Sequence, residues 1–362
     1  MRAHRLAALA VAAPESVYYL LGLDHLGYFA FTLLIVPRDG LPVLVTREME
    51  RPTVAAQVRD CSHQVFADGE DPADVVLAAL ASATAPGQLV GLERQTMFFP
   101  PAVHDRVCTE LADRSFTDCT ALLAAQRAVK SAAELAHVRQ AAEISDVAMA
   151  AALGAAGSGV AEREVAAAAF SAMVRSGGDQ PGFLPLIRPL RRLDQEHVTW
   201  GNRALIPGAG LFIELSGCSR RYHAPLSRTV YLARLPDNAA EAHAAAVAGL
   251  EAALRALRPA ARSGEVYAAW QHAVAGSSAP AWPTRHHCGY LVGIGFPPSW
   301  VGGGEVLGLR PGGDLQIRAG MVFHLMSWVT RPAGHVVSDT VLVTPTGPEV
   351  LTKTPRELTV LP

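Results

Sequence analysis

The chain of 362 residues has no surplus of charge of either sign. It carries 31 lysines and arginines against 33 aspartates and glutamates, a formal net charge of −2, and no run of like charges. Binding to nucleic acid or to an anionic membrane surface requires a concentrated basic patch. The sequence therefore predicts that the chain binds neither nucleic acid nor membrane.

Paired cysteines and long apolar runs are missing as well. The five cysteines are scattered without a C-x-x-C spacing, which argues against a disulfide framework or a zinc ribbon and favours a reducing compartment. No apolar stretch approaches the roughly 18 residues that a membrane helix needs. Residues 6–13 imitate a signal peptide, but the run is short and leads into residues 17–20, which we expect to form a core strand. We therefore expect a cytoplasmic protein.

What the chain does contain is material for a large core. Half of the residues are hydrophobic and 18% are charged, which excludes a disordered chain. At roughly 150 residues per domain, the length predicts two domains. Residues 1–125 alternate β-like runs with Ala/Leu-rich stretches, including a hairpin at 31–46, a helix at 72–83 and a strand at 88–92. This alternation predicts an α/β domain.

Residues 126–362 have a different pattern. Ser131 is followed three positions later by Glu134, a capping box that begins a long amphipathic helix ending before Gly157. Further helices are expected at 162–174, from Asn238 to about 257, and from Ser263. Between and after them lie β-rich stretches at 210–218, 222–233, 320–330 and 335–344. Helix pairs interleaved with long antiparallel strands predict an α+β domain.

Polar side chains within the β-rich stretches are the first candidates for chemistry. Glu214 is flanked by apolar residues on both sides, and burying a carboxylate is costly unless it is paired or reactive. Glu214 is therefore either half of a structural ion pair or a catalytic acid, base or nucleophile with a shifted pKa. Arg228 could be its ion-pair partner, or it could clamp a substrate carboxylate.

Four histidines, His197, His223, His287 and His324, are expected on separate strands. One strand histidine is usually a satisfied core residue, whereas four are harder to explain that way. The His-His-Cys sequence at 286–288 lacks the i, i+4 or C-x-x-C spacing of a convincing metal motif. Adjacent residues of a strand point to opposite faces, so at most one of these two histidines is expected to face a pocket.

The order of several motifs along the chain points to a known family. Residues 127–134 precede the long helix, and then come Glu214, Ser-Arg-Thr at 227–229, the His287 region, 319–323 and 338–344. The chain resembles the creatinase, Xaa-Pro aminopeptidase and methionine aminopeptidase family over essentially its whole length, including Tyr-Tyr-Leu-Leu-Gly at 18–22. The resemblance implies a pita-bread catalytic domain at 126–362 behind a creatinase-type α/β domain at 1–125.

The family's metal ligands are largely replaced in this chain. Metallopeptidases of the family hold two divalent metals with Asp, Asp, His, Glu and Glu. The corresponding positions are Glu214, Pro225, His287, Met326 and Ser338. Proline offers no ligand, a thioether is soft and a hydroxyl is weak, whereas hard divalent cations take several oxygens. The resemblance therefore implies no dinuclear metal centre and no cofactor, while a mononuclear site of His223, His287 and His324 stays open.

Within the family, creatinase and the ectoine-hydrolase branch cleave C–N bonds of small molecules without a dinuclear metal. The chain is similar to the ectoine-hydrolase branch at residues 197–200, 221–229, 289–300 and 323–324. It departs from that branch at the glycines 302–304 and at residues 285–288. The resemblance implies a metal-independent hydrolase of the C–N bond in a small amidine, guanidine or amide.

The resemblance also implies roles for individual residues. Glu214 would be the nucleophile or the base that activates water, and His197 would carry a proton to the leaving nitrogen. His223 and His287 would orient the electrophilic carbon. The substrate-binding residues would be Trp200, Tyr222, Arg228, Tyr290 and His324.

Two other functions stay open: a catalytically inactive pita-bread protein that binds a partner, and an Xaa-Pro-type metallopeptidase with a rearranged metal site. The retained Glu214, Arg228 and strand histidines favour the enzyme, since each costs desolvation in a core. The resemblance further implies a homodimer in which a loop at 24–29 or 94–101 reaches the pocket of the partner subunit. Exposed-type apolar and aromatic residues in those loops are typical of interface cores.

Overall fold

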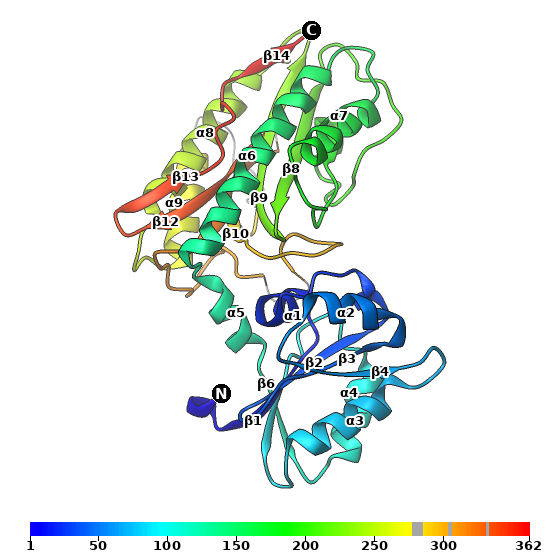
Figure 1. Ribbon diagram of the computed structural model, residues 1–362. Coiled ribbons are helices and arrows are strands. Elements are labelled where there is room, and N and C mark those ends of the chain that lie inside the picture. The colour runs from blue at the N-terminus through cyan, green and yellow to red at the C-terminus, as the bar shows by residue number, and fades with distance from the viewer. Residues whose placement is uncertain (277–284, 303–305, 331–332) are drawn as a thin grey trace. The chain divides into compact units, whose positions relative to one another are not determined.

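The computed structural model describes residues 1–276, 285–302, 306–330 and 333–362, and the chain forms two compact units (Figure 1). The first unit holds Met1–Arg127 and a short return of the chain at Gly302. The second unit holds Ala128–Val301 and Val306–Pro362. Both units combine helices with a sheet, and each has hydrophobic core clusters of its own.

The first unit is built on a six-stranded mixed sheet with the strand order β4-β3-β2-β1-β5-β6. The central strands β1, β2 and β3 are antiparallel, and the remaining neighbours are parallel. The strands are β1 (Leu6–Val11), β2 (Thr32–Pro37), β3 (Val43–Arg47), β4 (Ser62–Phe66), β5 (Leu89–Leu92) and β6 (Ser115–Asp118). The helices are α1 (Pro14–Leu21), α2 (Arg51–Gln57), α3 (Pro72–Ala83), α4 (Pro101–Glu110) and α5 (Thr120–Ala128). The predicted hairpin, helix and strand of this part are confirmed.

Residues 17–20 are not the strand that the sequence predicts. They belong to α1, whose first residue is Pro14, and the strand is the apolar run of β1 before it. The N–H groups of the two residues that precede α1 are bound by Glu93, which follows β5. Its carboxylate accepts hydrogen bonds from the amides of Ala12 (3.0 Å) and Ala13 (2.8 Å) and from the Ser16 hydroxyl (2.6 Å). Because this cap comes from a distant part of the chain, no local pattern reveals it.

The second unit is built on an eight-stranded sheet in which β10-β11-β12-β9-β8-β7 are neighbours, β13 pairs with β12 and β14 pairs with β9. The strands are β7 (Leu186–Pro189), β8 (Gly210–Ser219), β9 (Tyr222–Leu232), β10 (Gly289–Leu291), β11 (Val322–Val329), β12 (His335–Thr344), β13 (Gly347–Val350) and β14 (Thr359–Leu361). The helices are α6 (Ala132–Ala155), α7 (Glu162–Arg175), α8 (Ala239–Ala256) and α9 (Ser263–Ala275). The predicted helices and long strands of this part, including the capping box of α6, are confirmed.

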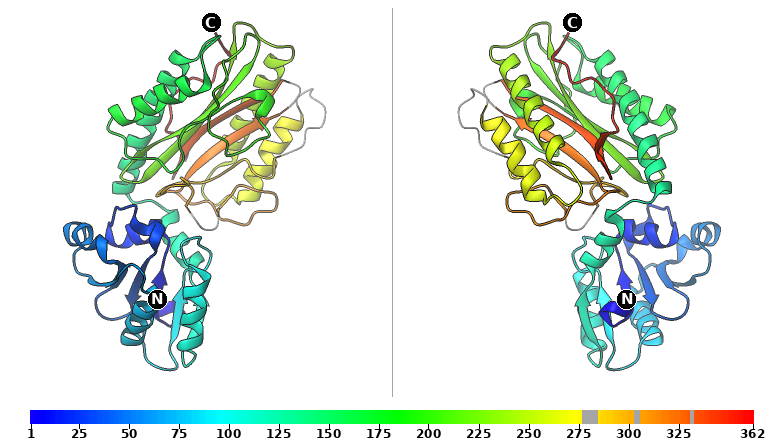
Figure 2. Two further views of the ribbon diagram at one scale, coloured as in Figure 1. Left: turned by 90° about the vertical axis from the view of Figure 1, so that its right-hand side faces the viewer. Right: turned by 90° about the vertical axis from the view of Figure 1, so that its left-hand side faces the viewer.

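Two helix pairs cover the strands of this sheet. Helix α6 packs on α7, β8 and β9, and α8 packs on α9, β11 and β12, so that the pairs stand on either side of the strands in Figure 2. Their apolar residues form two core clusters with the strand residues that face them. Since side chains alternate along a strand, the other residues of β8, β9, β11 and β12 point to the opposite face, here called the inner face.

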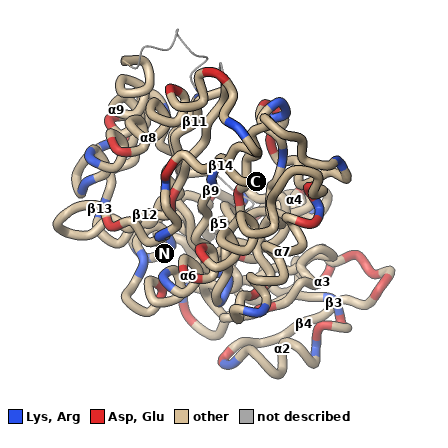
Figure 3. Tube along the Cα trace, turned by 90° about the horizontal axis from the view of Figure 1, so that it is seen from above, with Lys and Arg blue, Asp and Glu red and all other residues tan. Residues whose placement is uncertain are grey.

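Charged residues of both signs are spread along the described chain. In Figure 3, lysines and arginines are interspersed with aspartates and glutamates, in agreement with the balanced composition. In the described part of the chain, none of the helices combines the length and the apolar character needed to cross a bilayer.

Candidate active site

The inner face of the second unit carries its polar residues in a row across the strands. Glu214 of β8 lies opposite Ser227 of β9, Ser227 opposite Ser338 of β12, and Ser338 opposite Met326 of β11. Directly opposite residues of paired strands share a face. These residues include three of the five positions at which the family's peptidases hold metals, so the replaced ligands gather at one place.

Glu214 is buried at the centre of this row, with 7% of its surface exposed. Burial raises the pKa of its carboxyl group to about 7, and the nearby guanidinium groups of Arg188 and Arg285 offset only part of that effect. Its Oε1 lies 3.9 Å from Nε2 of His324. A carboxyl group that titrates near neutral pH can both accept and return a proton, which is the property of a general base.

His324 stands beside Glu214 in a chain of hydrogen bonds. The Ser338 hydroxyl lies 2.7 Å from Nε2 of His324 and 2.8 Å from the Ser227 hydroxyl. Because Ser338 donates its hydrogen to Ser227, it accepts a hydrogen from Nε2 of His324. Nδ1 then accepts from the hydroxyl of Tyr290 (3.0 Å), to which the Trp300 indole also donates (3.0 Å). Burial lowers the pKa of His324 to about 3, so the imidazole is neutral and its tautomer is fixed.

His287 lies next to this chain but outside any strand. The residues before Gly289 are irregular, so the expected strand at 285–288 begins only with β10. Nε2 of His287 accepts from Nε of Arg285 at 3.3 Å, and its ring packs against Tyr290 with centroids 5.9 Å apart. Burial lowers its pKa to about 3, and Nδ1 is buried with no hydrogen-bond partner among the described residues.

His223 has a structural partner instead of a place beside Glu214. Its Nε2 accepts the backbone N–H of Gly182 at 2.9 Å, and burial lowers its pKa to about 4. It lies four residues before Ser227 on β9, a separation of about 13 Å along a strand. The expectation that His223 orients the reacting carbon is therefore not supported by its position.

His197 and Trp200 lie on the exposed loop that follows Leu190–Arg192, so His197 is not a strand residue. The ring of His197 stacks on Phe183 with centroids 5.7 Å apart, and Phe183 meets Trp300 edge-on at 4.8 Å. This stack links His197 to the hydrogen-bond chain of His324. Trp200 is 36% exposed.

A buried carboxylate binds both ends of the loop that carries His197 and Trp200. Glu162 is fully buried at the start of α7, and its Oε2 accepts the backbone N–H of Gly201 at 2.6 Å. Arg192 supplies a cation 3.8 Å from the same oxygen. The two ends of the loop are thus fixed to one side chain.

Tyr222 was expected in the pocket but lies on the opposite, helix-covered face. Its hydroxyl donates to Oε1 of Glu134 at 3.0 Å, and its ring stacks on His137 of α6 at 5.9 Å. The reason is strand alternation, since His223 takes the inner face and its neighbour must take the other.

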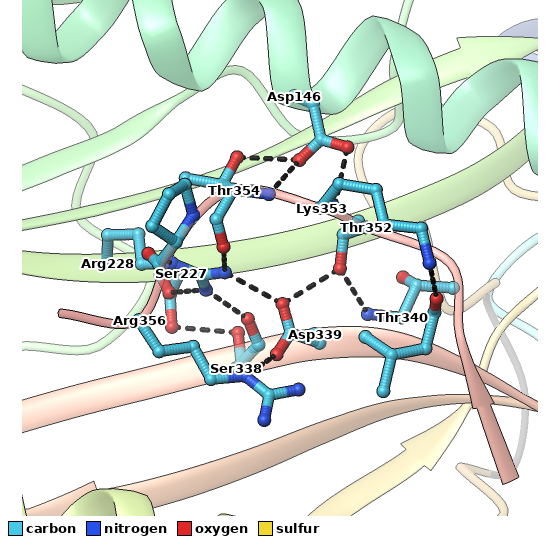
Figure 4. Close-up of polar contacts among 12 residues, drawn as sticks. Asp146, Ser227, Arg228, Ser338, Asp339, Thr340, Thr352, Lys353, Thr354 and Arg356 are labelled. Carbon is cyan, nitrogen blue, oxygen red and sulfur yellow. Dashed lines mark hydrogen bonds and ion pairs between the residues drawn. The ribbon is translucent and has the colours of Figure 1, made fainter.

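Arg228 neither clamps a substrate nor pairs with Glu214, which corrects both expectations. Its Nε donates to the carbonyl of Pro355, Nη1 to those of Ser227 and Ser338, and Nη2 to Asp339 and to the carbonyl of Thr354 (Figure 4). All five N–H donors are therefore used within the protein. Asp339 also binds Nε of Arg356 at 2.6 Å and the Thr352 hydroxyl at 2.8 Å, so this cluster fastens the C-terminal segment to the sheet.

Arg188, the arginine closest in register to Glu214, is not among the residues that the sequence predicts for the site. It lies on the inner face of β7, opposite Phe212, with its Cζ 4.6 Å from the centroid of that ring. It is 1% exposed, and Nε and Nη1 have no hydrogen-bond partner among the described residues. Only its place in a short apolar segment, Leu-Ile-Arg-Pro, could have indicated a buried cation.

The donors gathered here do not fit a pair of divalent metals. The row offers one carboxylate, a thioether and hydroxyls, and Nε2 of His287 is occupied by Arg285. Within the described ranges, no group of three or more His, Cys, Asp or Glu side chains is arranged to hold a metal ion.

Comparison with known proteins assigns the class. The chain belongs to metallopeptidase family M24, whose model matches residues 136–345. The creatinase/prolidase N-terminal domain matches residues 1–129. The family prediction made from the sequence motifs is thereby confirmed.

Individual relatives span nearly the whole chain. The ectoine hydrolase of Halomonas elongata is 27% identical over 377 residues, covering 97% of this chain and 92% of that protein. A probable dipeptidase PepE of Mycobacterium tuberculosis is 25% identical over 366 residues, covering 99% and 92%. The prolidase structure from Pyrococcus horikoshii has a TM-score of 0.85 at 22% identity, covering 99% and 97%. This likeness confirms the predicted pita-bread fold with its N-terminal domain.

Proposed function

We propose that this M24 hydrolase is metal-independent and cleaves the C–N bond of a small amidine, guanidine or amide, with Glu214 as its central catalytic residue. The observation that carries the proposal is the position of the buried Glu214 carboxyl group, which is in register with Ser227, Ser338 and Met326 where the metal-ligand positions of the family's peptidases are replaced. Burial also raises the pKa of this group to about 7. The likeness to an ectoine hydrolase supports a substrate of this kind.

The geometry supports a mechanism in which Glu214 accepts the proton of the attacking water. As a carboxylate it takes a proton from water while the water oxygen bonds to the electrophilic carbon. The C–N bond then breaks, and the leaving nitrogen receives a proton from the Glu214 carboxylic acid or from His197. Attack by Glu214 itself, followed by hydrolysis of the acyl-enzyme, uses the same residues. In both cases neutral His324 lies beside the carboxylate and is held in place by its hydrogen bonds to Ser338 and Tyr290.

A substitution at Glu214 tests this proposal. Purified protein is screened for amine release from ectoine, creatine and N-acetyl-2,4-diaminobutyrate, and turnover of the best substrate is compared with that of Glu214→Gln. We expect the variant to lose at least about a hundredfold in kcat, because an amide cannot accept the proton. Glu349→Gln, which removes an exposed carboxylate paired with Arg139, is the matched control and should stay active. A folded Glu214→Gln protein with full turnover contradicts the assignment.

Two alternatives are separated by the same screen. The dipeptidase and prolidase relatives favour a peptide substrate, and Xaa-Pro dipeptides are therefore included with and without added Mn²⁺. Hydrolysis of a dipeptide only with metal would replace the proposal by a metallopeptidase with a rearranged site. If no member of the set is cleaved, the chain is better described as a binding protein on the pita-bread fold.

A further inference from the structure

Arg188 is a buried charge whose hydrogen-bonding groups are not all satisfied by the described residues. Two of its nitrogens have no hydrogen-bond partner among the described residues, although nearly the whole side chain is covered. Burial renders His324 and His287 neutral, but an arginine cannot discard its proton in a protein. Buried polar groups in native structures are almost always hydrogen-bonded, and an exception calls for a ligand or a functional reason.

The neighbouring arginine has its partners within the chain. Arg285 binds Glu196 at 2.8 Å and His287 at 3.3 Å, and its Cζ lies 4.0 Å above the ring of Trp328. Arg188 shares the stacking arrangement, on Phe212, but has no acidic side chain within ion-pair distance in the described structure. Among the described residues Arg188 thus forms no ion pair at contact distance, although the Glu214 carboxyl group on the same face of the sheet acts on it electrostatically.

The register places Arg188 at a useful distance from the reactive group. Leu186 lies opposite Glu214 and Arg188 opposite Phe212, so Arg188 and Glu214 are diagonal neighbours on the inner face. Diagonal pairs have Cβ atoms roughly 7–8 Å apart. A molecule with a few bonds between an anionic group and a C–N bond spans this separation.

From these observations we propose that Arg188 binds a carboxylate of the substrate and is thereby a specificity-determining residue of this site. The carboxylate supplies a counter-charge at contact distance and hydrogen-bond acceptors, and it fixes the scissile C–N bond beside Glu214. The inference rests on the proposed hydrolase, but it is stated for binding, so the two can be tested separately.

The test compares each carboxylate with its primary carboxamide in calorimetric titrations. The probes are ectoine, creatine and N-acetyl-2,4-diaminobutyrate, and the proteins are the full chain and the variants Arg188→Gln, Arg188→Lys and Arg191→Gln. Arg191 is an exposed neighbour on the same stretch of chain and serves as the control. Thermal melting establishes that each variant folds.

We expect the unmodified chain to bind at least one carboxylate tenfold or more tightly than its carboxamide. Arg188→Gln should lose that preference by weakening only the carboxylate, Arg188→Lys should keep part of it, and Arg191→Gln should keep all of it. Equal binding of both forms by the unmodified chain, no binding of any carboxylate, or an undiminished preference in Arg188→Gln would overturn the inference. If Arg188→Gln does not fold, the inference is tested by the affinities of the unmodified chain and of Arg188→Lys for each carboxylate and its carboxamide.

The outcomes also separate the inference from the proposed function. A carboxylate preference without amine release would support Arg188 as an anion-binding residue and rule out the proposed hydrolase activity. Amine release at equal rates from carboxylate and carboxamide would support the hydrolase activity and rule out the proposed role of Arg188.

Discussion

At the scale of single residues, the buried carboxyl group of Glu214 couples folding to pH. Its pKa is raised from the ordinary value of 4.5 to about 7 because burial disfavours the charged form. Below about pH 4.5 the group is protonated in both the folded and the unfolded chain, so burial of the charge costs nothing there. As the pH rises from about 4.5 to about 7, only the unfolded chain has released the proton, and the folded state loses stability.

This coupling predicts how Glu214→Gln changes stability. The variant lacks the titration, so its free energy of unfolding relative to the unmodified chain should increase between pH 4.5 and 7 by about 3 kcal/mol, and then level off. Denaturant unfolding of both proteins at several pH values measures the difference. Parallel curves over this range would mean that the carboxyl group is not desolvated as the structure indicates.

The same group predicts the pH dependence of the reaction. If Glu214 acts as the base, kcat/KM should rise tenfold per pH unit below an apparent pKa near 7 and become flat above it. The buried histidines, with pKa values lowered to about 3 and 4, should add no further limb between pH 5 and 8. A profile that rises with an apparent pKa near 4.5 would place the base elsewhere.

At the scale of elements, α1 depends on a cap from another part of the first unit. Glu93 accepts two backbone amides and the Ser16 hydroxyl, and a glutamine would offer only one oxygen acceptor and place an NH₂ group against these donors. Glu93→Gln should lower the free energy of unfolding by about 2–3 kcal/mol. Glu70→Gln, which affects an exposed carboxylate bonded to the amide of Ala67, is the control and should cost under about 0.5 kcal/mol. Equal effects of the two variants would show that the buried cap is not important.

The elements also show what the sequence could and could not predict. The capping box at Ser131 and Glu134 is local, and the helix begins where it indicates. The Val-Tyr-Tyr-Leu run at 17–20 predicts a strand by its composition, although Pro14 and Gly22 mark the start and the end of the helix that forms there. Glu214 was identified because a carboxylate interrupts an apolar strand, a signal that needs no partner.

The site residues were harder to predict than the elements. Arg228 and Tyr222 were misplaced because their role depends on which face of β9 each one occupies and on the register with β12, neither of which the sequence specifies. Arg188 was missed because β7 has only four residues and is recognisable only from its pairing with β8.

At the scale of the whole molecule, we propose that the chain is a homodimer. Loops 24–29 and 94–101 pack together in the first unit through Tyr28 and Phe98, whose ring centroids are 5.2 Å apart. Beside them, Phe29 is 77% exposed and Met97 is 62% exposed. Exposed aromatic and methionine side chains are typical of interface cores.

Sedimentation equilibrium at micromolar concentration should give twice the chain mass of 38.2 kDa. Replacing Phe29 and Met97 by serine should shift the protein to monomer and reduce turnover, if one of these loops contributes to the pocket of the partner subunit. If the unmodified chain is a fully active monomer, both the proposed dimer and the proposed role of the loops are wrong.

We propose that Glu214 takes the role that the metals have in the family's peptidases. The most direct measurement is amine release by protein that has been chelated, dialysed and analysed for Mn, Co, Zn and Fe. We expect well under one equivalent of metal per chain and undiminished turnover, with turnover lost in Glu214→Gln. Stoichiometric metal whose removal abolishes turnover, and whose return restores it, would overturn the metal-independent mechanism and make Glu214 a ligand.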